Sequence, residues 1–198
     1  MRWLIRVLVV AGLVLLVSGL WIPLKAALAQ QLLQQAWSET QARGSGVRPW
    51  PWADTWPVAQ LLLPGQEHGY IVLAGSGHGQ SLAFAPTLVT GTLQQEQGLI
   101  VIAAHRDTHF RGLKTLTRGA TLELTAPSGR QRRYTVSTTR VVDSRRTRLY
   151  AASPTDPGPD QLVLVTCYPF DVVSAGGPLR YVVIAEPVPD TASAAPSA

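Results

Sequence analysis

The side chain best suited to chemistry in this sequence is that of Cys167, the only cysteine among 198 residues. It ends the apolar segment 161–167, which has the length and composition of a β-strand. The chain opens with a hydrophobic segment typical of export, and exported proteins normally pair their cysteines. A cysteine without a partner in its own chain indicates either an intermolecular disulfide or a reactive thiol.

Arg180 is placed to lie beside this thiol. It begins the predicted strand 180–186, which follows the cysteine strand along the chain. In an antiparallel hairpin the end of one strand lies next to the start of the other. Cys167 and Arg180 are therefore expected at the same rim of a sheet, with residues 168–179 as an overhanging loop.

His105 ends the predicted strand 99–104 and reaches the same rim if that strand runs parallel to the cysteine strand. A thiol is a strong nucleophile only as the thiolate, and a nearby imidazole can take its proton and later protonate a leaving amine. A fixed, permanently charged guanidinium suits the oxyanion formed in acyl transfer. Together Cys167, His105 and Arg180 favour acyl transfer, although each alone also fits an inert core or surface position.

The elements that must position these residues are short β-branched segments separated by turns. The predicted strands are 58–63, 70–74, 99–104, 121–125, 132–142, 161–167 and 180–186. The fourth and fifth form a hairpin around Ser128-Gly129, and short helices fit only at about 79–85 and 111–116. The pattern predicts a mostly antiparallel barrel or sandwich.

The N-terminus predicts a membrane segment. Arg2 and Arg6 precede an uncharged run at residues 7–24, which is near the lower limit for crossing ~30 Å of hydrocarbon. The flanking positive charges predict a cytoplasmic N-terminus with the remaining chain outside. A signal peptide cleaved after Ala27-Leu28-Ala29 is the alternative. The run exceeds the ~7–15 residues of a signal-peptide core, which favours an uncleaved anchor.

Between the anchor and the strands lies a connecting region. Residues 26–41 have apolar positions at helical spacing and predict a short amphipathic helix. Residues 48–57 are rich in proline and tryptophan, which excludes a helix or a central strand. We expect Trp50, Trp52 and Trp56 to pack this extended arm onto the domain, and the alternative is an exposed ligand-binding arm.

The composition limits the possible partners. The formal net charge is +5, with arginine clusters at 130–133 and 145–148. We interpret these clusters as a solvated basic face on a membrane-tethered domain, because no segment resembles a nucleic-acid-binding module. We therefore expect no nucleic-acid partner.

Three motifs, in this order, resemble those of the sortase family. Residues 105–110 (His-Arg-Asp-Thr-His-Phe) resemble its histidine motif, residues 164–167 its cysteine motif Thr-Leu-x-Thr-Cys, and residues 176–183 its arginine strand. The resemblance covers about residues 48–186. The extension 167–171 (Cys-Tyr-Pro-Phe-Asp), together with the Pro/Trp arm, resembles the Gram-negative branch, the class GN sortases.

This resemblance implies an eight-stranded barrel, a single N-terminal anchor and a cysteine transpeptidase mechanism. Cys167 would form the thioacyl intermediate, His105 would act as acid and base, and Arg180 would hold the substrate carbonyl. The implied partners are a protein with a C-terminal sorting signal resembling Leu-Pro-x-Thr-Gly, an amine acceptor and the inner membrane, with the catalytic domain in the periplasm. Some sortases hold calcium with clustered acidic residues. Here those residues are few and dispersed, so we expect no metal or other cofactor.

The implied division of the chain is 1–25 for the cytoplasmic tip and anchor, 26–57 for the helix and arm, 58–187 for the catalytic barrel and 188–198 for a disordered tail.

Several assignments stay open at this point. Thr166, Asp107 and Asp171 are candidates for substrate contacts, although local loop capping explains the aspartates as well. His109 is the rival of His105, and its spacing from His105 also fits a zinc pair on a helix, for which no third ligand is evident. The alternative functions are a cysteine peptidase that releases its substrate to water and a non-catalytic envelope-anchored binding domain.

Overall fold

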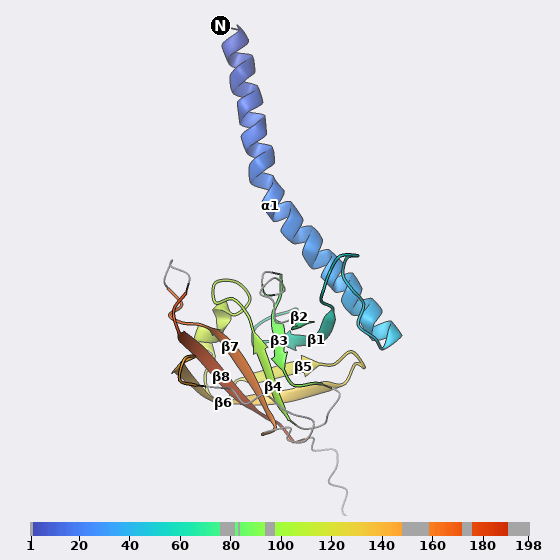
Figure 1. Ribbon diagram of the computed structural model, residues 1–198, viewed down its shortest axis with the longest axis vertical. Helices are drawn as coiled ribbons and strands as arrows, with labels where there is room; N and C mark the ends of the chain where they lie inside the picture. The colour runs from blue at the N-terminus through green and yellow to red at the C-terminus, as the bar shows by residue number, and fades with distance from the viewer. Residues whose placement is uncertain are drawn as a thin grey trace, which may run out of the picture.

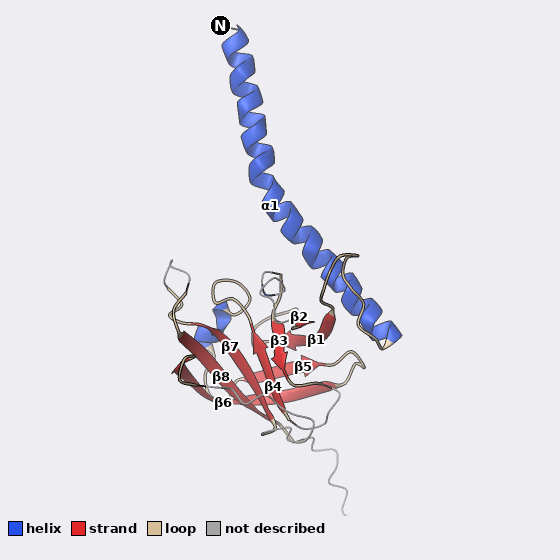
Figure 2. Ribbon diagram, viewed as in Figure 1, coloured by secondary structure: helices blue, strands red, loops and turns tan. Residues whose placement is uncertain are grey.

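The computed structural model describes residues 2–75, 82, 84–93, 98–147, 159–171 and 176–189. A long helix precedes the strands, and a short 3₁₀ helix, Arg111–Thr115, lies where the sequence predicts a helix at 111–116 (Figures 1 and 2). The elements are α1 (Arg2–Arg43), β1 (Pro57–Leu62), β2 (Tyr70–Ala74), β3 (Thr87–Thr90), β4 (Leu99–Ala103), β5 (Thr121–Thr125), β6 (Gln131–Asp143), β7 (Gln161–Cys167) and β8 (Leu179–Pro187).

The strands close into a barrel in the order β1-β2-β3-β4-β7-β8-β6-β5. The predicted barrel is therefore confirmed, as are the β5–β6 and β7–β8 hairpins. Two neighbouring pairs, β2–β3 and β4–β7, are parallel, and the others are antiparallel. Sequence analysis missed β3, because this strand is four residues long and its Val89 side chain is 62% exposed, so it lacks the apolar signature of a core strand.

The barrel interior explains why these segments are strands. Inward positions recur every second residue along β1, where Ala59 and Leu61 are fully buried, and this period matches the alternation of side chains across a sheet. The central strand β4 is buried on both faces: Ile102 joins the interior cluster, whereas Val101 packs with Val163 of β7 in a separate cluster. Burying a side chain of this size contributes about 1.5–3 kcal/mol, which fixes the strand that ends next to His105.

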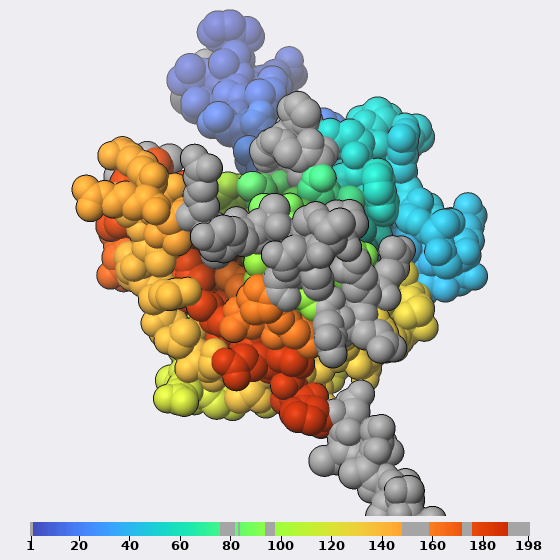
Figure 3. Space-filling view, turned by 60° about the horizontal axis from the view of Figure 1, so that its bottom comes forward, coloured from blue at the N-terminus to red at the C-terminus, as the bar shows by residue number. Residues whose placement is uncertain are grey.

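α1 is one continuous helix where we expected a membrane segment followed by a separate amphipathic helix. Its N-terminal part stands clear of the barrel (Figures 1 and 3) and is long and apolar enough to cross a membrane. Its C-terminal part is amphipathic as predicted, because Leu33 and Trp37 pack against Ile71 and Leu73 of β2. Pro23 lies inside the helix and removes one backbone hydrogen bond, which proline-containing helices accommodate by bending.

The expectation that all three tryptophans pack the Pro/Trp arm onto the domain is wrong for one of them. Trp52 does not pack onto the domain, since 83% of it is exposed. The arm is held instead by Thr55, whose hydroxyl donates to the carbonyl of Ala74 at 2.8 Å, and by Trp50, whose ring meets that of Phe84 edge to face at 5.3 Å. Ala53 is buried beside Trp52, and Trp56 is also exposed, although less so, at 39%.

Some predicted features lie outside the described residues. These are most of the predicted helix 79–85, Arg148 of the second arginine cluster and the tail from residue 190 onward.

Candidate functional site

The β7–β8 register makes Cys167 and Arg180 direct cross-strand partners. The N–H of Tyr168 donates to the carbonyl of Leu179 at 3.1 Å, so that pair is the hydrogen-bonded one. In an antiparallel ladder the next pair is then non-hydrogen-bonded, with Cα atoms about 4.5 Å apart and both side chains on one face. The thiol and the guanidinium therefore leave the sheet from adjacent positions.

His105 comes to the same rim because β4 runs parallel to β7. Ala103 is paired with Val165, and the N–H of Ala104 donates to the carbonyl of Val165 at 3.2 Å. Parallel neighbours end at the same edge of a sheet, so the residues that follow β4 and β7 lie together. The prediction for His105 required β4 to run parallel to the cysteine strand, and it does.

Thr166 joins the ends of these two strands. Only 3% of this residue is exposed, and its hydroxyl donates to the carbonyl of Ala104 at 2.7 Å. The bond connects the residue before Cys167 to the residue before His105, which restrains the two side chains relative to each other. Substrate binding by Thr166 stays a prediction, and the contact that the structure gives its hydroxyl is internal.

Arg180 is oriented by its own loop. Its Nη1 donates to the carbonyls of Gly177 at 2.7 Å and Leu179 at 2.9 Å. Gly177 has φ +106°, a left-handed conformation that glycine adopts without the steric cost of a Cβ atom. A guanidinium has five N–H donors, and both of these bonds use the same nitrogen. The geometry thus restrains the side chain through Nη1, which is one of three nitrogens in the fork.

The exposure of the three side chains suits a site open to a macromolecule. Cys167 is a free thiol at an intermediate level of burial, Arg180 is also half-buried, and His105 is exposed. A thiol sealed in the core would fit the inert alternative, and this thiol is accessible.

The turn after β4 is fixed by its last residue. The N–H of Phe110 donates to the carbonyl of His105 at 3.0 Å, and the Phe110 side chain is completely buried. Residues 106–110 therefore form a closed turn and not a helix, so the helical His-x-x-x-His arrangement does not form. Among the described residues, no group of three or more His, Cys, Asp or Glu side chains is placed to hold a metal ion.

His109 differs from His105 in its surroundings. Its ring meets that of Tyr70 edge to face at 5.4 Å, and its Nδ1 lies 3.3 Å from the hydroxyl oxygen of Thr108. Burial, and secondly the positive charge of a protonated His105, lower the pKa of His109 below its ordinary value of 6.5. His109 is thus neutral at pH 7 and packed as part of the wall beside His105.

Sequence reasoning missed an aromatic cluster next to the cysteine. Phe170 meets Tyr181 edge to face at 5.2 Å, and Tyr168 stacks on Tyr181 at 6.4 Å. Arg106 of the histidine turn adds a bond from its Nη1 to the carbonyl of Pro169 at 2.8 Å. The signal that points to this cluster is the spacing of two aromatic residues directly after Cys167.

The two candidate aspartates lie at the surface. Asp107 is exposed in the histidine turn, and Asp171 forms an exposed ion pair with Lys114 at 3.7 Å. Such surface pairs are worth roughly 0–1 kcal/mol. Their role toward a substrate stays a prediction.

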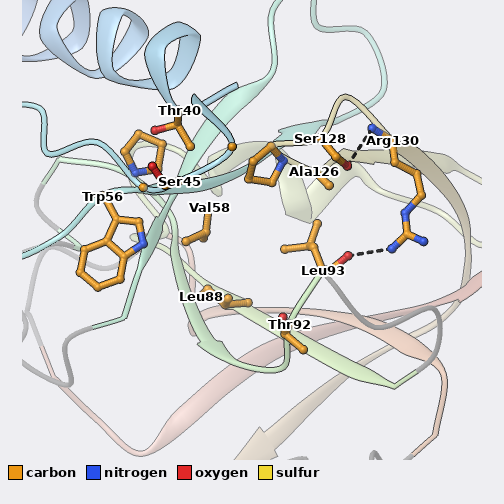
Figure 4. A pocket seen from close by; sticks show the side chains of 14 residues that line it. Thr40, Ser45, Trp56, Val58, Leu88, Thr92, Leu93, Ala126, Ser128 and Arg130 are labelled. Carbon is orange, nitrogen blue, oxygen red and sulfur yellow. Dashed lines mark hydrogen bonds between the residues drawn. The ribbon is translucent and has the colours of Figure 1, made fainter. Parts of the chain in front are cut away.

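A cleft of about 540 Å³ lies away from this rim, between the C-terminal end of α1 and the β5–β6 turn (Figure 4). Trp56, Val58 and Leu93 contribute to its wall, and Arg130 donates from Nη2 to the carbonyl of Leu93 at 2.7 Å. None of the three candidate catalytic residues lines it.

The fold and the rim define a class of protein, closed β-barrels that carry a cysteine, a histidine and an arginine at one edge. A family model described as the sortase domain matches residues 61–188, more than half of the chain, and the chain therefore belongs to the sortase family.

Individual relatives support the family assignment. Sortase D of Bacillus subtilis (strain 168) is 35% identical over 88 residues, which are 44% of this chain and 42% of that protein, so the matched stretch spans less than half of the relative. Sortase A from Corynebacterium diphtheriae, as a lid mutant, superimposes with a TM-score of 0.57 and 21% identity over 84% of this chain and 97% of that chain. Sortase C-1 from Actinomyces oris superimposes with a TM-score of 0.53 and 22% identity, over 68% of this chain and 74% of that chain. At these identities the two structures establish the fold alone.

Proposed function

We propose that this protein is a membrane-anchored cysteine transpeptidase. It cleaves a sorting signal resembling Leu-Pro-x-Thr-Gly in a protein substrate and transfers the acyl part to an amine. The proposal is supported above all by the direct cross-strand pairing of Cys167 with Arg180. His105 follows β4, which runs parallel to β7 and ends at the same rim.

In the first half-reaction the thiolate of Cys167 attacks the scissile carbonyl. A tetrahedral oxyanion forms, and the guanidinium of Arg180 stabilises its charge. The imidazolium of His105 gives a proton to the leaving amine as the C–N bond breaks, which leaves a thioester on Cys167.

In the second half-reaction an acceptor amine attacks this thioester. His105, now neutral, takes a proton from the amine, and Arg180 stabilises the second oxyanion. Collapse forms the new amide and releases the thiolate. The cycle uses no oxidant and returns every group to its starting state.

Two further parts of the proposal concern the surroundings of this triad. We propose that Thr166 acts as a positioning residue, on the strength of its buried bond to Ala104. We propose that Asp107 and Asp171 contact the substrate, because both are exposed next to the rim.

The membrane part of the proposal rests on α1. Its N-terminal run and the preceding Arg2 and Arg6 support a single-pass anchor in the inner membrane with the barrel in the periplasm. Residues 26–57 then act as a spacer, 58–187 as the catalytic barrel and 188–198 as a tail. Assignment to class GN rests on the Tyr-Pro-Phe-Asp sequence at 168–171 and the Pro/Trp arm.

The decisive test is mass spectrometry of the enzyme mixed with a sorting peptide. We expect a mass increase on Cys167 equal to the acyl part of the peptide, and none for Cys167→Ala, whose thermal unfolding is unchanged. An added amine should convert the adduct to an amide product. Release of free acid in the presence of excess amine indicates a peptidase. The absence of any adduct together with slow alkylation of Cys167 indicates a binding domain.

A further inference from the structure

An apolar cleft of about 570 Å³ separates α1 from the Pro/Trp arm. Leu28 and Leu32 of the helix form one wall, and Trp50, Trp52 and Phe84 line the other side. Three of these side chains face solvent to an unusual degree: Trp52 is 83% exposed, Leu28 55% and Phe84 39%. A cluster of exposed large apolar groups next to a helix of this kind marks an interaction surface.

The position of this cleft along α1 indicates what covers it. Lys25 is the first charged residue after the apolar run, and its Nζ lies 4.6 Å from the ring centroid of Trp21. A tryptophan next to a lysine is typical of the membrane–water interface. At about 1.5 Å of rise per residue, Leu28 lies ~4–5 Å and Leu32 ~10 Å beyond this charge, and tilt shortens both heights. The polar layer of a bilayer is about 5–8 Å thick on each side, so Leu28 lies within this layer and Leu32 lies at its outer edge.

The arm presents Trp52 from a fixed loop. After the end of α1 the chain turns back along the helix before entering β1 (Figure 1). The N–H of Val47 donates to the Thr40 hydroxyl at 3.0 Å, and the N–H of Ala53 donates to the carbonyl of Trp50 at 3.0 Å. Gly46 lies so close to the ring of Trp56 that a Cβ atom would collide with it. These contacts fix the loop while leaving the ring of Trp52 in solvent.

We propose that Trp52, Phe84 and Leu28 form an interfacial anchor that seats this edge of the protein in the headgroup layer of the bilayer crossed by α1. The inference rests on the membrane part of the proposed function. The charged residues of the cleft, Lys25 and Asp54, have opposite signs, so the aromatic and apolar groups dominate and a zwitterionic bilayer suffices.

This seating has a consequence for the cysteine rim. Strands β4 and β7 both end on the side of the barrel on which the N-terminal part of α1 extends (Figure 1). With the arm in the interface, the rim that carries Cys167 faces the bilayer. A protein substrate that is itself held in the membrane then meets the thiol without having to bend around the barrel.

The test uses the full chain in phosphatidylcholine nanodiscs, with Cys167→Ser to remove the native thiol. Single cysteines are introduced by Trp52→Cys, by Leu15→Cys within the apolar run and by Glu186→Cys at the end of β8 away from the N-terminal part of α1 (Figure 1). Each is labelled with an environment-sensitive fluorophore and exposed to nitroxide lipids or to aqueous iodide. Positions 52 and 186 are both exposed, so the labels leave the fold intact, which thermal unfolding verifies.

We expect the label at position 52 to show a blue-shifted emission and to lose intensity to a shallow nitroxide lipid but not to iodide. The label at 15 should be quenched by a deep nitroxide, and the label at 186 by iodide alone. If position 15 is quenched by lipid while position 52 behaves like position 186, the interfacial anchor is wrong and the membrane span stands. If position 15 is not quenched by lipid, both fail. Shielding of position 52 from both quenchers would show a protein partner in place of lipid.

Discussion

The cysteine rim and the Pro/Trp arm both project from the same barrel, but they are held in different ways. At the rim, sheet register sets the positions: Cys167 faces Arg180 because β7 and β8 pair residue by residue, and Thr166 bonds to Ala104 across β4 and β7. In the arm, a few loop contacts hold the backbone and leave Trp52 in solvent. The rim thus holds its side chains in a defined geometry, whereas the arm exposes an apolar surface. Changes at the rim should therefore affect the chemical step, and changes in the arm should affect only how the barrel is placed at the membrane.

After loss of the nucleophile itself, the largest effect is expected at His105. His105→Ala should lower kcat/KM for a sorting peptide by ~10²–10⁴, because a positioned acid–base group contributes about that much. His109→Ala should lose far less, since His109 packs against Tyr70. Steady-state kinetics on both variants decide the matter, and a greater loss at His109 would reverse the assignment.

Arg180→Lys comes next and tests whether the fork of donors matters beyond the charge. Lysine has three donors on one nitrogen, so two bonds to the loop carbonyls would leave only one for an oxyanion, whereas the guanidinium keeps three after its two Nη1 bonds. We expect a loss of ~10²–10³ in kcat with an unchanged melting temperature, the usual cost of one oxyanion donor. Near-normal turnover of the lysine variant would leave charge as the only contribution.

Thr166→Val tests whether the bond between the ends of β4 and β7 positions the rim residues. It removes a buried hydroxyl and leaves the carbonyl of Ala104 without that partner, which costs about 1–3 kcal/mol. Urea unfolding should show this loss, and kcat should fall while KM changes little. Thr166→Ser keeps the hydroxyl and is the matched control; if it is as impaired as the valine variant, the bond is not responsible.

Trp52→Ser is expected to have the smallest effect and to separate the arm from the rim. Turnover of a soluble peptide should be unchanged, because Trp52 lies in the arm and 83% of it is exposed to solvent. Turnover of a membrane-tethered substrate in the same vesicles should fall severalfold, since α1 keeps the tether but the orientation of the barrel is lost. Equal losses on both substrates would show that Trp52 supports the catalytic barrel itself. No loss on either substrate would show that Trp52 has no role in turnover at the membrane.

Local patterns in the sequence were sufficient for much of the fold. Short apolar, β-branched segments between turn residues located β2, β5 and β7 at their observed bounds and the other predicted strands to within one residue, because such side chains favour a buried sheet. The ends of those strands marked Cys167, Arg180 and His105 as candidates. The charge pattern around residues 7–24 identified the apolar run, since crossing hydrocarbon requires a continuous uncharged segment.

Tertiary structure decided what depends on partners far along the chain. Only the barrel closure makes β4 the parallel neighbour of β7 and brings Ala104 to Thr166 across 62 positions of sequence. The short strand β3 is defined by its pairing with β2 and β4, because four β-favouring residues alone are too few to mark a strand. Trp52 is exposed although its residue type favours burial, because the surrounding contacts fix the backbone with the ring outward. Register and packing depend on pairing between segments far apart in the sequence. The residue pattern within one segment does not show which other segment it will pair with.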